Sequence, residues 1–146
     1  MTISKVGIHK KGEITLEDLI QSAKKIKNIN EAGAIATFTG IVRGFTKDGK
    51  QVSKLEYEAY EEEVIKSFEK ICDDAEKDDE ILYVMIHHVI DELNVSEDIV
   101  YVVVVGKHRK AVFRTLEEVV ERFKKESPIW KKEHTTEGTA KWIANA

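Results

Sequence analysis

Residues 81–105 read ILYVMIHHVIDELNVSEDIVYVVVV and hold two strongly apolar runs, 81–90 and 98–105, on either side of the polar connector DELNVSE. Runs of this length that are rich in Val, Ile and Tyr are typical of buried strands. The short connector indicates that the two strands are antiparallel neighbours. We therefore expect a core sheet built on this pair, with the rest of the chain adding strands and covering helices.

Outward from this pair, strands and helices alternate along the chain. Helical spacing of apolar residues predicts helices from Thr15 to residues 28–30, over 61–77 and over 107–126. Alternation or β-branched runs predict strands over 3–8, 33–43 and 52–60. With an extended segment after Pro128, the order is βαββαββαβ. This order predicts a single α+β domain over 1–146, with a mainly antiparallel sheet covered by helices.

The composition is that of an ordinary soluble domain, with 42% hydrophobic and 34% charged residues. The net charge of −4 argues against general nucleic-acid binding, which needs a basic face. No apolar run approaches the roughly 18 residues needed to cross a membrane, and the N-terminal residues lack the hydrophobic core of a signal peptide. We expect a cytoplasmic protein with no nucleic-acid or membrane partner.

Metal and cofactor motifs are not apparent in the sequence. The single cysteine, Cys72, lies in the apolar stripe of the helix over 61–77, so we expect a buried structural thiol. His87 and His88 are adjacent on a strand, so their side chains point to opposite faces and cannot share a metal ion. No nucleotide-binding, zinc-protease or calcium-loop motif is present. We predict no metal site and no resident cofactor.

The segment 123–133, FKKESPIWKKE, contains the only proline and two lysine pairs. Pro128 has no backbone N–H and restricts the residue before it, so the last helix should end there. Lys124 and Lys131 would then lie on either side of a rigid corner. Such a pair could bind or process an anion, or it could be an exposed basic helix end that favours the helix dipole.

Three further cations are candidates for the same anion. His108 and Arg109 follow a core strand at the start of the last helix, where free N–H groups and the helix dipole suit an anion, although they could simply cap this junction. Arg43 leaves a strand of small residues beside Gly40 and Gly44; taken alone it is more often a surface residue. From the residues alone, the chain is an anion-binding α+β domain.

Four segments, in order along the chain, resemble the large, catalytic subunit of molybdopterin synthase, the MoaE family. They are GAIATFTGIVR (33–43), LEYEAYEE (55–62), VVVVGKHRKAVF (102–113) and FKKESPIWKKE (123–133). Gly138 and Trp142 also fit the end of the family pattern. The resemblance implies an α/β-hammerhead-like fold with a small β subdomain. One turn departs from the pattern: Val89, Asp91 and Ser96 stand where the family usually has an arginine and two glycines.

The resemblance also implies a reaction in molybdenum cofactor biosynthesis. A sulfurtransferase of this family adds two sulfurs to cyclic pyranopterin monophosphate, which forms the dithiolene of molybdopterin. The sulfur would come from a thiocarboxylate on the C-terminal Gly-Gly tail of a small, MoaD-like sulfur-carrier subunit. The large subunit would be a homodimer with one small subunit at each end, which makes a heterotetramer.

Site residues are carried over by their position in these motifs. The resemblance implies that Lys124 and Lys131 are catalytic, and that Lys125 lies on the surface. Because clustered cations lower one another's pKa, one of the two lysines could act as acid or base near neutrality. The implied substrate-binding residues are Ile41, Val42, Arg43, His108, Arg109, Lys124, Lys131, Lys132 and Glu133.

Two other hypotheses remain open at this point. The chain could be a non-catalytic module that binds an anionic ligand or the acidic C-terminal tail of a partner, or a structural subunit whose lysines are solvated. Conversion of bound pterin would distinguish the enzyme from the binding module. Absence of any pterin or small-subunit binding would favour the structural subunit.

Overall fold

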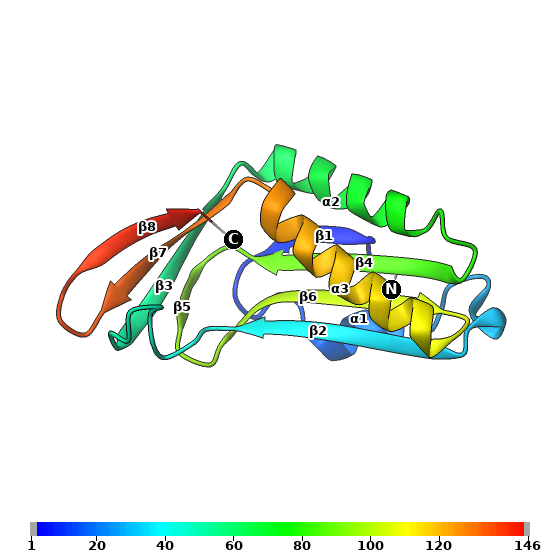
Figure 1. The fold of residues 1–146 in the computed structure, drawn as a ribbon, viewed down its shortest axis with the longest axis horizontal. Helices are drawn as coiled ribbons and strands as arrows, with labels where there is room; N and C mark the ends of the chain where they lie inside the picture. The colour runs from blue at the N-terminus through cyan, green and yellow to red at the C-terminus, as the bar shows by residue number, and fades with distance from the viewer. Residues whose placement is uncertain (1–2, 145–146) are drawn as a thin grey trace.

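A four-stranded sheet centred on β4 and β6 organises the fold (Figure 1). The computed structural model describes residues 3–144, so the ends of the predicted 1–146 domain lie outside the described residues. The described elements, in chain order, are β1 (Val6–His9), α1 (Leu16–Ala23), η1 (Ile29–Glu31), β2 (Ala34–Ile41), β3 (Val52–Ala59), α2 (Glu61–Ala75), β4 (Ile81–Val89), β5 (Glu92–Asn94), β6 (Asp98–Gly106), α3 (Arg109–Glu126), β7 (Ile129–Thr135) and β8 (Ala140–Ala144).

The first sheet has the order β1-β4-β6-β2. The apolar strands β4 and β6 are antiparallel neighbours at its centre, as predicted from residues 81–105. β2 is antiparallel to β6 on one side, and β1 is parallel to β4 on the other. β1, at Val6–His9, is the strand predicted over 3–8 and begins three residues later than expected.

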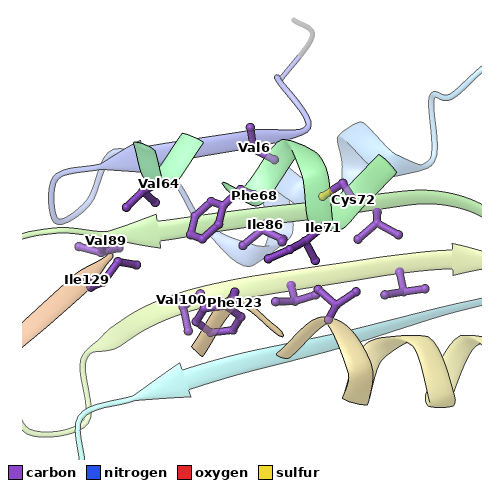
Figure 2. Close-up of a cluster of buried hydrophobic side chains, with 14 of the residues drawn as sticks. Val6, Val64, Phe68, Ile71, Cys72, Ile86, Val89, Val100, Phe123 and Ile129 are labelled. Carbon is purple, nitrogen blue, oxygen red and sulfur yellow. The ribbon is translucent and has the colours of Figure 1, made fainter. Parts of the chain in front are cut away.

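Helices cover both faces of the first sheet. Alternate residues of β6 belong to two separate clusters, one beneath α2 and α3 and one beneath α1. Figure 2 shows the first cluster, in which Phe68 and Ile71 of α2 point toward Ile86 of β4 while Phe123 of α3 lies near Val100 of β6. Cys72 is buried in the same cluster, as predicted, and burial raises the pKa of its thiol.

The second sheet, with the order β5-β3-β7-β8, extends beyond one end of the first (Figure 1). The predicted α+β fold with a small β subdomain is confirmed. Two of its strands were not predicted: β5 is only three residues long within a polar connector, and β8 is mostly exposed. β5 contributes one side chain, Leu93, to the core, and β8 has no buried residue, so neither shows a strong apolar alternation. Hydrogen bonds to β3 and β7 hold them in the sheet.

Two local predictions differ from the structure. The first helix ends at Ala23 instead of residues 28–30, because the chain turns after Lys24 while Ile26 and Ile29 still pack against the core. Apolar spacing alone therefore overestimated its length. In the turn after β5, Ser96 has a left-handed φ of 74° where the family pattern has a glycine, so the turn forms without that glycine.

The end of α3 follows the prediction from Pro128. Ser127 has extended backbone angles, and its N–H donates to the carbonyl oxygen of Phe123 at 3.1 Å. The chain then enters β7, which pairs antiparallel with β3. This corner places Lys124 on the helix and Lys131 on the strand. None of the helices within residues 3–144 is both long and apolar enough to cross a membrane.

Candidate functional site

A cavity of about 890 Å³ opens where the two sheets and the last turn of α3 meet; we call it the basic pocket. This volume is within the range of small-molecule sites. The pocket is lined by the end of β2 with the following loop, by the start of β6, by the end of α3, and by β3, β7 and β8. Elements far apart in sequence therefore meet around one space.

Positive charge dominates the lining of the basic pocket. Within the described residues, six cationic side chains line it against two carboxylates, those of Asp48 and Glu133. The cations belong to Arg43, Lys47, Lys50, Lys124, Lys131 and Lys141. No side chain of these six forms an ion pair with any part of the chain that the structure describes. Unpaired cations around a cavity favour an anionic ligand.

The surroundings of Lys131 lower its pKa. It is half-buried on β7, directly opposite Tyr57 of β3. Burial lowers the pKa of Lys131, and the charges of Lys124, Lys47 and Arg43 lower it further, while Glu133 acts in the opposite direction. Lys131 therefore releases a proton more readily than an ordinary lysine, which suits a proton donor or acceptor.

The strand leading to Arg43 forms one wall of the pocket. Ile41 and Arg43 are exposed and line it, whereas the Val42 side chain is only 2% exposed and points into the core. A Cβ on Gly40 would lie 2.8 Å from the Cγ1 atom of Val100. This position therefore needs glycine for close packing, as the small residues of the strand suggested.

The other residues of the basic segment divide between two faces of β7. Glu133 lines the pocket beside Lys131, since residues two apart on a strand share a face. The ammonium group of Lys132 lies on the other face, 5.6 Å from the ring centroid of Trp142. Lys125 is exposed and 3.9 Å from Glu121, in agreement with its predicted surface position.

His108 and Arg109 lie away from the basic pocket within one chain. They mark the start of α3, and a rise of about 1.5 Å per residue separates Arg109 from Lys124 by about 22 Å. His108 Nδ1 donates to the Glu80 carboxylate at 2.6 Å. Arg109 is exposed. One chain thus brings together five of the nine residues expected to bind substrate, namely Ile41, Arg43, Lys124, Lys131 and Glu133.

Several pocket residues were not identified from the sequence. Lys47 and Lys50 lie in a loop that reads as a generic polar turn, and Lys141 lies on the unpredicted strand β8. Buried side chains also line the pocket, and we call four of them its floor: Leu55, Tyr57, His88 and Phe123. For Lys47 and Lys50, the charge of the loop was the only sequence feature that could have indicated a role in the pocket. Their proximity to Lys131 depends on how the two sheets are arranged.

Within residues 3–144, no group of three or more His, Cys, Asp or Glu side chains is arranged to hold a metal ion.

Known proteins similar to this chain include both proteins of comparable length and longer ones. A probable molybdopterin synthase of Haloferax volcanii is 41% identical over 125 residues, which are 85% of this chain and 48% of that protein. The chain thus spans about half the length of that relative. The molybdopterin synthase catalytic subunit of Pyrococcus abyssi is 39% identical over 140 residues, covering 96% of this chain and 91% of that subunit.

Solved structures share the whole architecture. The crystal structure of molybdopterin synthase from Staphylococcus aureus has a TM-score of 0.83 at 35% identity and covers 97% of this chain and 98% of its own. A complex of subunits 1 and 2 of molybdopterin-converting factor from Helicobacter pylori includes a chain with a TM-score of 0.74 at 25% identity, covering 97% of this chain and 90% of its own. The family model described as MoaE protein matches residues 9–126. The chain therefore belongs to the MoaE family.

Proposed function

We propose that this chain is the catalytic subunit of molybdopterin synthase and acts as a sulfurtransferase on cyclic pyranopterin monophosphate. The observation that carries the proposal is the convergence of Lys124, Lys131 and Arg43 on one cavity in a MoaE-family chain. Each of these residues belongs to a family motif, and they come from three separate segments: the end of α3, β7 and the loop after β2. The product is the dithiolene of molybdopterin, formed by the transfer of two sulfurs.

The positive charge of the basic pocket suits a reaction between two anions. The pterin monophosphate and the thiocarboxylate that donates sulfur are both anions, so they repel each other as they approach. Unpaired cations around one cavity offset this repulsion and hold the two reactants together. A water-excluding floor strengthens these interactions because the local dielectric constant is low.

Lys124 and Lys131 have complementary positions for this chemistry. Lys131, whose pKa is lowered by burial and by neighbouring cations, exchanges a proton with the reacting pterin. Lys124 faces the same space from the end of α3 and stabilises negative charge. The corner at Pro128 keeps the helix and the strand in a fixed relation, so both lysines are preorganised around the substrate.

The sulfur donor is a partner in this proposal. The complex of subunits 1 and 2 from Helicobacter pylori supports a small sulfur-carrier subunit that binds this chain. Its C-terminal Gly-Gly thiocarboxylate would enter the basic pocket. Cys72 is no substitute donor, because its thiol is buried beneath α2 and its pKa is raised. We also propose a cytoplasmic location for the reaction, in keeping with a sequence that has a single, buried cysteine.

His108 and Arg109 fit the same proposal only in a homodimer. Because they lie at the far end of α3, they cannot contact a substrate that is bound between Lys124 and Lys131 of their own chain. Two copies related by a two-fold axis could each supply this pair to the other's pocket. One small subunit at each pocket would complete the proposed heterotetramer.

Reconstitution tests the proposed activity. The chain is incubated with thiocarboxylated small subunit and cyclic pyranopterin monophosphate, and the dithiolene pterin is measured. Product formation is expected. If a known synthase makes product under these conditions and this chain does not, the proposal fails, and retention of unconverted pterin would then favour a non-catalytic binding module.

Subunit mixing tests the contribution of His108 and Arg109 across the dimer. Lys131→Ala and Arg109→Ala are each expected to be nearly inactive. After dissociation and remixing, a two-fold dimer should regain about a quarter of the wild-type activity, because half of the dimers then carry one intact pocket. No recovery, in dimers shown to have exchanged subunits, would contradict the assignment.

A further inference from the structure

Two adjacent histidines on β4 have very different surroundings. His87 has a partner at each ring nitrogen: its Nε2 donates to the Ser4 carbonyl at 2.8 Å, and its Nδ1 accepts from His9 Nε2 at 2.7 Å. His88 Nδ1 bonds to the Val89 carbonyl at 2.9 Å, but its Nε2 has no partner. Across residues 3–144, this is the one buried side-chain nitrogen or oxygen without a hydrogen bond.

The single hydrogen bond of His88 determines its tautomer. A carbonyl oxygen can only accept, so Nδ1 carries the proton and Nε2 presents a lone pair. The side chain is 1% exposed, and burial, aided by the charge of Lys124, lowers the pKa of His88 to about 4. His88 is therefore a neutral imidazole with a buried acceptor that costs free energy until a donor arrives.

The packing of His88 connects it to both lysines of the basic pocket. Its ring meets the edge of Tyr57, with centroids 5.2 Å apart, and Tyr57 is directly opposite Lys131 in the β3–β7 pairing. The His88 ring also meets the Phe123 ring, with centroids 6.3 Å apart, and Lys124 is the next residue of α3. His88 thus lies in the pocket floor, in contact with the residue that pairs with Lys131 and with the residue that precedes Lys124.

Lys124 is the donor best suited to the vacant acceptor. Its ammonium group has three N–H donors and no acceptor. Its side chain makes no hydrogen bond or ion pair with residues 3–144, while its charge acts on His88. Both residues line the same cavity, and Lys124 carries its ammonium group on a flexible four-carbon stem.

We propose that His88 is a positioning residue whose Nε2 atom accepts a hydrogen bond from the Lys124 ammonium group and so fixes that group at the floor of the basic pocket. The consequence for turnover rests on the proposed function, whereas the contact itself does not. Tyr57 and Phe123 hold the imidazole ring in place, and the Val89 carbonyl holds its tautomer. The unpaired nitrogen is then part of the site and not a packing defect.

Nuclear magnetic resonance tests the contact without any assay of activity. Long-range proton–nitrogen spectra of the imidazoles are recorded for the wild type, for Lys124→Met and for the matched control Lys125→Met. We expect His88 to be protonated at Nδ1, with an Nε2 resonance that moves toward the free-acceptor position only in Lys124→Met. Identical Nε2 resonances in all three proteins, or a proton on Nε2, would overturn the proposal.

Two substitutions of His88 test the consequence for turnover. His88→Gln places a carbonyl oxygen near the Nε2 position, whereas His88→Asn reproduces only the Nδ1 position. We expect His88→Gln to retain kcat within about threefold and His88→Asn to lose at least about tenfold, with the KM for pterin changed less than kcat. Equal kcat values for two folded variants would count against positioning. An inactive wild type would instead defeat the proposed function and leave the spectra to decide the contact.

Discussion

Two cations near the C-terminal end of α3, Arg122 and Lys124, have opposite environments. Arg122 faces outward, where its Nη1 lies 2.9 Å from Asp74 of α2 and its Nε lies 2.6 Å from Glu126. Lys124, two residues later, faces the basic pocket and has no ion pair with any described residue. On the same helix, the charge of Arg122 therefore connects α3 to α2, whereas the charge of Lys124 is available to bind a ligand.

The pKa shifts show the same difference. Hydrogen bonds from Arg122, Lys77 and Lys70 lower the pKa of Asp74, so this carboxylate stabilises the folded chain as long as it is ionised. In the pocket, burial and neighbouring cations lower the pKa of Lys131, so its charge opposes folding. A cluster that opposes folding indicates selection for binding or chemistry.

Loss of a pocket lysine should have the largest effect. Lys124→Ala and Lys131→Ala are each expected to lower turnover by well over tenfold, on the order of a hundredfold, because each removes an acid–base or electrostatic group from the reacting centre. Rates with saturating small subunit measure this. Near-normal rates in both variants would refute the roles assigned to the lysines.

Lys125→Ala is the matched control for that experiment. Lys125 is adjacent to Lys124, but its side chain is 75% exposed and points away from the pocket toward Glu121. Its loss removes an equal charge from the same helix turn. We expect turnover within about twofold of the wild type, since an exposed pair at this distance contributes little.

Removal of Arg122 should have the opposite result, a loss of stability with little loss of turnover. Arg122→Ala is expected to lower the midpoint of thermal unfolding by about 2–4 °C, because it removes the ion pairs of Arg122 with Asp74 of α2 and with Glu126. Turnover should stay near normal, since these pairs lie outside the pocket. Thermal unfolding followed by circular dichroism measures the change. Arg114→Ala, which breaks the single pair with Asp78, is the control and should have a smaller effect.

Replacing Lys131 by an uncharged residue should stabilise the fold. Lys131→Met is expected to raise the unfolding midpoint at neutral pH by about 1–2 °C, because it removes a charge that folding buries among other cations. Lys132→Met, on the opposite face of β7, should give no such gain.

The pH dependence of that gain follows from linkage. Since the pKa of Lys131 is lower in the folded chain than in the unfolded chain, the unfolded chain binds more protons between the two values. The penalty is complete below the folded-state pKa and disappears as pH rises through the ordinary lysine value. A gain from Lys131→Met that grows with pH would contradict this account.

The smallest effect is expected from Lys47. Its charge lowers the pKa of Lys131, so Lys47→Ala should shift the limb of the pH–rate profile that reports Lys131 to higher pH. High salt should reduce the difference from wild type, since exposed charges are screened. Lys50→Ala is the control from the same loop, and an equal shift there would indicate a general loss of charge.

Much of the fold could be predicted because it depends on strong local signals. The apolar runs of β4 and β6 indicated the central pair, and Pro128 marked the end of α3. The parallel pairing of β1 and the short strand β5 could not be predicted, because both depend on hydrogen bonds between distant segments. Apolar spacing past Ala23 was misleading, since turn residues also pack against the core.

The candidate site was predictable only where motifs carried it. Lys124, Lys131 and Arg43 were identified from motifs, and the pocket that contains them follows from the meeting of the two sheets. The sequence showed His88 only as one of two strand histidines on opposite faces. Its lack of a partner at Nε2 depends on how Tyr57, Phe123 and the Val89 carbonyl surround it, which a pattern of residue types does not specify.

A crystal structure with cyclic pyranopterin monophosphate bound tests the central claim most directly. We expect the pterin in the basic pocket, with its polar atoms within about 3 Å of the ammonium groups of Lys124 and Lys131, while Arg122 keeps its pairs with Asp74 and Glu126. A well-ordered pterin bound elsewhere, with both lysines facing solvent, would contradict it.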